Sequence, residues 1–206
     1  MDFTVRYDRR MAFGYPVMLD LQDVRVLLVG GGVVATRKAE GLVAAGARLT
    51  VVAPAIRPEL VDVAHRVELR PYRSADLAGH RLVFTATDDP AVNAQVAFDA
   101  RSAGLWVNSA DDPVNCSFIL PAVARRGPVV VSVGTDGASP ALARHLRDRI
   151  AAEVLTAEVE LAADDLAHQR AEVHAEGGST EDIDWTGRVQ SALEQARRRI
   201  EARGSW

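Results

Sequence analysis

The sequence has 206 residues, 48% of them apolar and 25% charged, and its 24 basic and 28 acidic side chains give a net charge of −4. This composition excludes disordered and collagen-like chains and leaves enough residues for one core, with or without an appendage. The single cysteine, Cys116, excludes an intrachain disulfide, and the acidic balance argues against nucleic acid as a partner.

No apolar run is long enough to span a membrane. The stretch from Met11 to Leu19 is interrupted by Gly14 and Pro16 and ends at Asp20. A membrane-spanning helix needs about 20 apolar residues. We therefore expect no signal peptide, no membrane association and a cytoplasmic location, with which the single cysteine agrees.

A strand, a helix and a second strand are predicted between residues 24 and 53. Residues 24–29 (VRVLLV) form a β-branched apolar run that ends in three glycines. Residues 33–45 contain no proline and are followed by Gly46, whereas residues 48–53 are rich in strand formers and stop at Pro54. This order predicts a right-handed parallel crossover unit.

The alternation of strands and helices continues toward residue 110. Strands are predicted at residues 67–69, 82–86 and 105–108, and a helix at residues 90–103. The fold class is therefore α/β, with a Rossmann-like doubly wound parallel sheet in this part of the chain.

The pattern changes after Pro113. A strand is predicted at residues 129–133, and Ser139 followed by Pro140 is typical of a helix start, which predicts a helix to about residue 155. Further helices are predicted at residues 156–176 and in a C-terminal stretch where Val189, Leu193 and Ile200 share a face, with a linker at residues 176–180.

A glycine-rich turn lies between the first predicted strand and the first predicted helix. Such a turn lets the backbone approach a pyrophosphate, and the start of the helix favours its negative charge. This context favours dinucleotide binding over a purely structural turn. Arg37 and Lys38 follow and either add charge to the site or are solvated surface cations. The G-x-G-x-x-A pattern consists of Gly30, Gly31, Gly32, Val33, Val34 and Ala35.

The end of the second predicted strand lacks the acidic residue that usually binds the ribose hydroxyls. Residues 51–55 contain no carboxylate, and the next one is Glu59. Arg57 leaves a 2′-phosphate conceivable, so the residues alone do not decide between NAD and NADP.

Two acidic pairs follow two later strands, where ligands of doubly wound sheets bind. For Asp88 and Asp89 before Pro90, helix capping is the favoured interpretation. For Asp111 and Asp112 before Pro113, helix capping is the less favoured interpretation, because a loop rather than a helix is predicted to follow. Asp111 is therefore the candidate for proton transfer near a nicotinamide.

Several separated motifs together resemble the precorrin-2 dehydrogenase / sirohydrochlorin ferrochelatase family, which includes the N-terminal module of siroheme synthases. The resemblance covers about residues 14–155 and implies oxidation of precorrin-2 to sirohydrochlorin with NAD, followed in some members by Fe²⁺ insertion. The motifs are YPVMLDL (15–21), GGGVVATRK (30–38), TATDD (85–89) with Asn93, NSAD (108–111), SFILPA (117–122) and SPALAR (139–144).

The resemblance also assigns roles and an organisation. It implies a homodimer with an NAD-binding domain at residues 1–112, a small α+β dimerisation element at 113–148 and a helical region at 149–206. The catalytic aspartate of the family falls on Asp111, and its cofactor positions fall on the glycine turn with Val33 and Val34, on Pro54 and Ala55, and on Thr87 and Asp88.

The substrate that the resemblance implies carries eight carboxylates, so an acidic protein needs a local group of cations. Arginines gather between residues 125 and 149, at 125, 126, 144, 147 and 149. The alternative is a solvated helix face that includes Asp148. The expected substrate-binding residues are Ser117, Ser139, Arg144, His145 and Arg147.

No resident metal site is predicted, since no His, Cys and Glu side chains have the spacing of metal ligands. Cys116 is expected to be a small buried residue. Ferrochelatase activity stays open, and an NAD(H)-sensing dimeric regulatory module is the rival function. Four scattered histidines are expected at the surface: His65, His80, His168 and His174.

Overall fold

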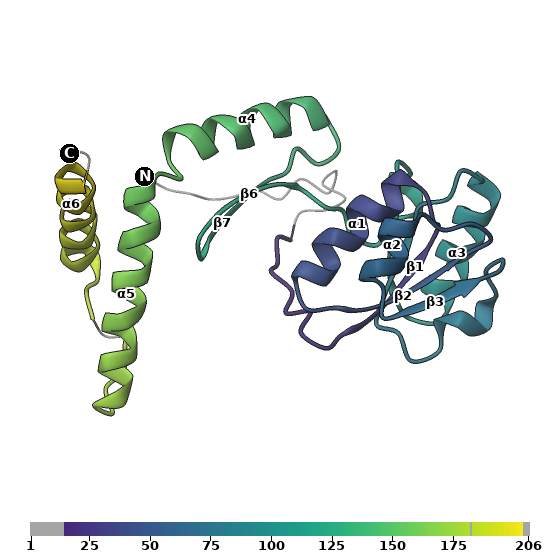
Figure 1. Cartoon of the computed structure of the whole chain (residues 1–206), viewed down its shortest axis with the longest axis horizontal. Coiled ribbons are helices and arrows are strands. Elements are labelled where there is room, and N and C mark those ends of the chain that lie inside the picture. Colours follow the sequence, from purple (N-terminus) through teal and green to yellow (C-terminus); the bar gives the residue numbers. More distant parts are fainter. Residues whose placement is uncertain (1–14, 182, 204–206) are drawn as a thin grey trace. The chain divides into compact units, whose positions relative to one another are not determined.

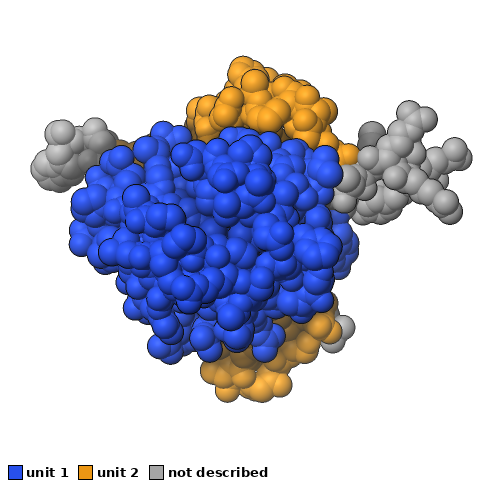
Figure 2. All heavy atoms as spheres, turned by 90° about the vertical axis from the view of Figure 1, so that its right-hand side faces the viewer, with its two compact units in different colours: residues 1–120 blue, residues 121–206 orange. Residues whose placement is uncertain are grey.

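The computed structural model describes residues 15–181 and 183–203, so part of the apolar stretch at residues 11–19 lies outside the described residues. The chain divides into two compact units, residues 1–120 and residues 121–206 (Figure 2). Among the described residues, no helix is long and apolar enough to cross a bilayer.

The first unit is built around a five-stranded sheet in the order β3-β2-β1-β4-β5, with every neighbouring pair parallel. This order confirms the predicted doubly wound sheet, because the chain moves outward from β1 in one direction and then in the other. The strands are β1 (Arg25–Val29), β2 (Arg48–Ala53), β3 (Arg66–Leu69), β4 (Leu82–Thr85) and β5 (Trp106–Ser109). Figure 1 labels three strands of this sheet, β1, β2 and β3.

Helices cover both faces of this sheet. Alternate side chains of a strand point to opposite faces, and two separate apolar clusters result. In one cluster α1 (Val33–Ala44) and α2 (Pro58–Val63) pack on the side of Val26 and Leu28. In the other, α3 (Pro90–Ser102) and the short 3-10 helix η1 (Ser74–Leu77) pack on the side of Leu27 and Val29. The central strands are thus buried on both faces, as their continuous apolar runs predict.

The second unit contains an antiparallel hairpin and three helices. Ser139 caps the first helix as predicted, since its hydroxyl accepts a hydrogen bond from the amide of Leu142 at 3.1 Å. The elements are β6 (Ala122–Arg126), β7 (Val129–Val133), α4 (Pro140–Glu153), α5 (Ala157–Ala175) and α6 (Thr186–Arg203).

The buried face of α6 differs from the predicted one. Val189 and Leu193 remain 39% and 37% exposed, whereas Ala192 and Ala196 are buried against Ala162 of α5. Small side chains let two helix backbones approach closely. The predicted stripe of large apolar residues is therefore not the face that α6 buries against α5.

Two regular elements, α2 and β6, and two helical turns, η1 and η2 (Pro113–Asn115), were not predicted. Helix α2 has only six residues, and β6 carries two arginines on a short strand, so neither has a strong periodic signal. The 3-10 helix η2 lies within the expected loop.

Residues 113–120 belong to the first unit. Phe118 meets Phe84 edge-on, with 5.5 Å between ring centroids, and belongs to the cluster on the α1 side of the sheet. The compact division thus falls after Leu120. The three-part division at residues 112 and 148 stays a prediction.

Candidate active site

A pocket of about 610 Å³ opens at the carboxyl ends of β1, β4 and β5. It brings together six of the residues predicted from sequence: Gly32, Val33, Val34, Thr87, Asp88 and Asp111. The other lining residues are Ala86, Pro90, Asn93, Ala110 and Asp112.

The glycine turn has the form that a dinucleotide pyrophosphate requires. A Cβ on Gly31 would lie 2.0 Å from the carbonyl oxygen of Ala55, and one on Gly30 would lie 2.3 Å from that of Ala86. A Cβ on Gly32 would meet nothing within 4 Å, so this residue faces open space. Two glycines thus pack the turn closely, and the third leaves room in front of it.

The start of α1 is free to bind an anion. Gly32 is its N-cap and supplies no side-chain capping bond, so first-turn N–H groups lack the usual cap. Val33 and Val34, the first two residues of the helix, line the pocket and are about half exposed. These observations fit NAD, with its pyrophosphate held by backbone groups.

The loop after β2 is tied to the glycine turn. The amide of Arg57 donates to the carbonyl of Gly31 at 3.0 Å, and Pro54 and Ala55 are exposed beside this turn. They do not line the pocket itself. The Arg57 guanidinium forms an ion pair with Glu59 at 3.1 Å, so it is engaged within the protein.

Asn93 holds the loop after β4. Its Oδ1 accepts hydrogen bonds from the hydroxyl groups of Thr85 and Thr87 and from the amide of Thr87, and its Nδ2 donates to the carbonyl of Thr87 at 3.0 Å. Asp89 caps α3 by accepting from the amide of Ala91 at 2.8 Å, which confirms capping. Asp88 is exposed and lines the pocket.

Asp111 lies in the turn after β5 in the left-handed backbone region, with φ of 57°. Aspartate tolerates this region better than most residues. The turn is held by the amide of Ala110, which donates to the carbonyl of Thr85 at 2.9 Å. The Asp111 carboxylate is exposed at the pocket, whereas that of Asp112 accepts a bond from Asn115 at 2.6 Å. Asp111 is thus the carboxylate available to a ligand.

Lys38 lies close to this turn and forms a contact that the sequence did not indicate. It is half-buried, and its Nζ donates to Oδ1 of Asn108 at 2.8 Å and lies 5.7 Å from the centroid of the Phe84 ring. Burial lowers the pKa of Lys38, while the charge of the nearby Asp111 carboxylate acts in the opposite direction. Lys38 is therefore no solvated surface cation, whereas Arg37 is exposed.

Asn108 and Cys116 connect this lysine to the turn. Nδ2 of Asn108 donates to the carbonyl of Phe118 at 3.0 Å. Sγ of Cys116 accepts from the amide of Ser109 and donates to its carbonyl, both at 3.2 Å. Burial raises the pKa of the Cys116 thiol, so the half-buried residue acts as a neutral clamp on the strand that leads to Asp111.

The predicted substrate-binding residues belong to different units: Ser117 to the first, and the others to the second. The hydroxyl of Ser117 accepts from the amide of Val107 at 3.3 Å and does not line the pocket. On α4, Arg144 and His145 are exposed, whereas Arg147 is paired with Asp148 at 2.7 Å. Two other predicted cations are also paired: Arg126 with Glu160 and Arg149 with Glu153, both at 3.1 Å.

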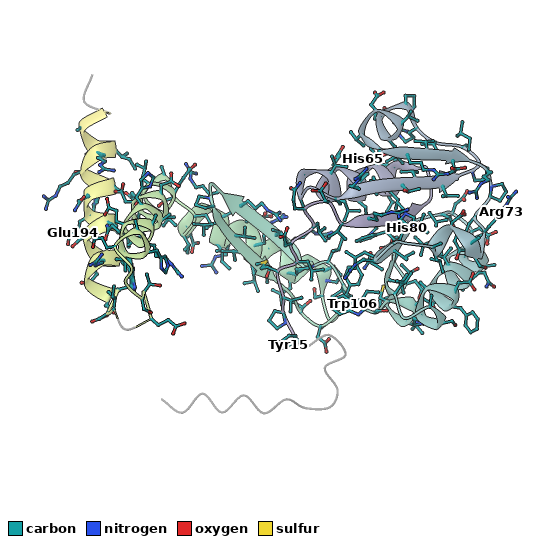
Figure 3. All side chains as sticks on the ribbon, turned by 90° about the horizontal axis from the view of Figure 1, so that it is seen from below. Tyr15, His65, Arg73, His80, Trp106 and Glu194 are labelled. Atoms are coloured by element: carbon teal, nitrogen blue, oxygen red, sulfur yellow. The ribbon has the colours of Figure 1, made fainter. Side chains whose placement is uncertain are left out.

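The histidines differ from expectation at one position. His80 is only 8% exposed and lies within the first unit (Figure 3), whereas His65, His168 and His174 are exposed as predicted. Among the residues described, no group of three or more His, Cys, Asp or Glu side chains is arranged to hold a metal ion.

Comparison with known proteins identifies a matching family and similar relatives. The model of the family described as "Putative NAD(P)-binding" matches residues 17–122. Siroheme synthase of Chromobacterium violaceum is 49% identical over 140 residues, and siroheme synthase of Pseudomonas putida strain F1 is 45% identical over 151 residues. These stretches cover 66% and 71% of this chain, but only 30% and 33% of the two relatives.

A solved structure is similar over nearly the whole chain. SirC, a precorrin-2 dehydrogenase, superimposes with a TM-score of 0.71 at 28% sequence identity, over 90% of this chain and 100% of SirC. The family match spans just over half of the 206 residues and contains the glycine turn and the pocket. This chain therefore belongs to the NAD(P)-binding family that the model describes, and it is related to the siroheme synthases and to SirC.

Proposed function

We propose that this protein is an NAD-dependent dehydrogenase that oxidises precorrin-2 to sirohydrochlorin in siroheme synthesis. The observation that carries the proposal is that one pocket is lined both by Gly32 of the glycine turn and by Asp111. The similarity to SirC and to the siroheme synthases supports precorrin-2 as the substrate.

The reaction removes two hydrogens from the macrocycle, one as a hydride and one as a proton. When bound, NAD⁺ supplies the hydride acceptor. The turn at Gly30–Gly32 and the start of α1 would hold its pyrophosphate, and Thr87 and Asp88 border the same pocket. Asp111 accepts the proton, because its carboxylate is exposed at the pocket and the left-handed turn holds it there.

Cations on α4 are proposed to bind the carboxylates of the substrate. Arg144 and His145 are the exposed candidates, and Ser139 caps the helix that presents them. Arg147 would have to leave Asp148 in order to take part. A role for Ser117 is a weaker proposal, since its hydroxyl is engaged with the backbone of β5. A homodimer, with residues 113–148 as its dimerisation element, belongs to the same proposal.

The test replaces Asp111 by asparagine, with Asp23→Asn as the matched control. Asp23 is also exposed and left-handed, with φ of 58°, but does not line the pocket. Loss of a general base typically costs about 10²–10⁴ in rate. We expect kcat of Asp111→Asn to fall at least about 100-fold while Kd for NAD⁺ stays within about twofold.

Formation of NADH absorbance after precorrin-2 is added to the wild type with NAD⁺ provides the assay. Near-normal turnover of Asp111→Asn would remove this residue from the mechanism. Binding of NADH without any turnover by the wild type would favour a regulatory NAD(H) sensor. An anaerobic assay with sirohydrochlorin and Fe²⁺, measured against a blank without enzyme, tests whether the protein also inserts the metal.

A further inference from the structure

A second hollow, of about 230 Å³, lies on the sheet of the first unit and shares no lining residue with the pocket at Asp111. It lies where β1, β2 and β3 carry polar rather than apolar side chains, on the face that η1 and α3 cover elsewhere. The polar lining residues are Arg25, Thr50, Arg66, Glu68, Arg70, Asp76 and His80, and the others are Val52, Ala75 and Ala78.

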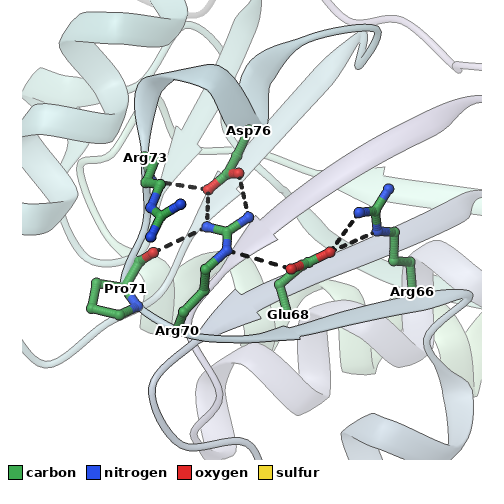
Figure 4. Close-up of polar contacts among 6 residues, drawn as sticks. All are labelled: Arg66, Glu68, Arg70, Pro71, Arg73 and Asp76. Carbon is green, nitrogen blue, oxygen red and sulfur yellow. Dashed lines mark hydrogen bonds and ion pairs between the residues drawn. The ribbon is translucent and has the colours of Figure 1, made fainter.

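Both carboxylates of the hollow are engaged by neighbouring groups. Asp76 binds the guanidinium of Arg70 through both oxygens, at 2.7 and 2.8 Å, and accepts the amide of Arg73 at 2.9 Å (Figure 4). Glu68 pairs with Arg66 at 2.6 Å and with Arg70 at 3.4 Å. Both carboxylates of the hollow therefore already accept hydrogen bonds from groups of the protein.

His80 is a buried side chain without a hydrogen-bond partner. It is 8% exposed, and neither Nδ1 nor Nε2 has a partner among the described residues. Burial lowers its pKa and the charge of Arg25 adds to this effect, while nearby backbone groups of Asp76 and Leu77 act in the opposite direction. A buried polar group without a partner is costly, and such groups are rare in folded proteins.

Arg25 completes an excess of positive charge. This first residue of β1 lines the hollow and forms no ion pair with any described residue. Three arginines therefore face two carboxylates there, and Thr50 adds a hydroxyl donor. The Arg25 guanidinium and the one N–H of the neutral His80 imidazole are donors without a partner, so an anionic acceptor complements them.

We propose that this hollow is a binding site for the oxyanion group of a small molecule, of phosphate or carboxylate type, held by Arg25, His80 and Thr50. A bound oxyanion supplies the acceptor that the imidazole lacks and neutralises the surplus cation. This proposal does not depend on the dehydrogenase activity, because the two sites share no residue.

The test follows the ring resonances of His80 by NMR while inorganic phosphate or acetate is added at constant pH and ionic strength, with chloride as the reference. The full-length chain is used, and His80→Gln identifies the resonance. We expect a saturable shift with phosphate or with acetate, and the responding anion identifies the chemical class. The apparent pKa of His80 should rise on saturation, because a bound anion stabilises the charged imidazolium. It thereby opposes the effect of the nearby positive charges of Arg25, Arg66 and Arg70.

Arg25→Gln should raise Kd of the responding anion by about tenfold or more, since it removes a charged hydrogen bond. Arg48→Gln is the matched control: Arg48 is exposed and pairs in register with Arg25, but it does not line the hollow. Its Kd should equal that of the wild type. The proposal is overturned if neither anion shifts His80 saturably, or if Arg25→Gln and Arg48→Gln weaken binding equally.

Discussion

Replacing Lys38 by methionine tests whether the lysine positions the turn at Asp111, the proposed proton acceptor. The change keeps the length of the side chain and removes Nζ, which donates to Asn108 at 2.8 Å. Asn108 is 5% exposed and belongs to β5, whose end leads into the turn at Asp111. The substitution therefore leaves a buried amide oxygen without its charged donor.

The effect on stability should be small because two contributions oppose each other. An unmatched buried acceptor costs about 1–3 kcal/mol. Burial already lowers the pKa of Lys38, so the ammonium itself destabilises the folded state, and its removal offsets part of that cost. We expect Lys38→Met to lose about 1 kcal/mol at pH 7.

The effect on activity should be larger. A displacement of about 1 Å at a reacting group can cost about 100-fold in rate, so we expect kcat to fall about 10–100-fold with little change in Kd for NAD⁺. Arg37→Met is the control, since Arg37 is exposed on the same helix. NADH formation and urea denaturation provide the two measurements. A kcat within threefold of the wild type would refute the positioning role.

The pH dependence of stability gives a second readout. The pKa of Lys38 is lower in the folded state, so the penalty for its charge is present at neutral pH. It disappears as pH rises through the folded value toward the unfolded value of about 10.4. The wild type should therefore gain stability relative to Lys38→Met between pH 7 and pH 10, and a constant difference would contradict this reasoning.

Three further predictions concern the turn, the ion pairs and the thiol. Gly31→Ala should lower the melting temperature and weaken NAD⁺ binding, because its Cβ would lie 2.0 Å from a backbone oxygen. Gly32→Ala should change stability by less than about 1 kcal/mol and weaken only NAD⁺ binding, because its Cβ would meet nothing within 4 Å. Equal melting temperatures of the two variants would contradict this prediction. Asp76→Asn should cost about 2 kcal/mol at pH 7 in urea denaturation. The bonds from Arg70 lower the pKa of Asp76, so its contribution is present above the unfolded value of about 3.9 and is lost as pH falls through the folded value; a deficit that does not shrink below about pH 4 would refute this sign. Iodoacetamide should alkylate Cys116 at pH 8 at least about tenfold more slowly in the folded than in the unfolded chain, since burial raises its pKa, and equal rates by mass spectrometry would show a reactive thiol.

The strand and helix order and much of the pocket could be predicted from sequence because their signals are local. A glycine turn between an apolar strand and a helix specifies its own geometry within a few residues. The parallel order of the strands then places every carboxyl end at one edge of the sheet. Asp111 was identified in this way, and the pocket brings it together with Gly32.

Contacts between distant segments could not be predicted in the same way. Lys38 meets Asn108 seventy residues later in the chain, and nothing near Lys38 in the sequence indicates this contact. His80 lies in a short polar segment that resembles a surface loop, yet the surrounding sheet and η1 bury it.

The sequence by itself thus determined the nucleotide-binding edge of the sheet, because hydrophobic periodicity, helix capping and glycine geometry act over a few residues. The tertiary structure alone decided which charged groups are engaged and which are left over: Arg147 is paired with Asp148, while Arg25 lines a hollow without an ion pair among the described residues. The physical reason is that desolvation and pairing depend on which surfaces meet, and residues distant in the chain determine those surfaces.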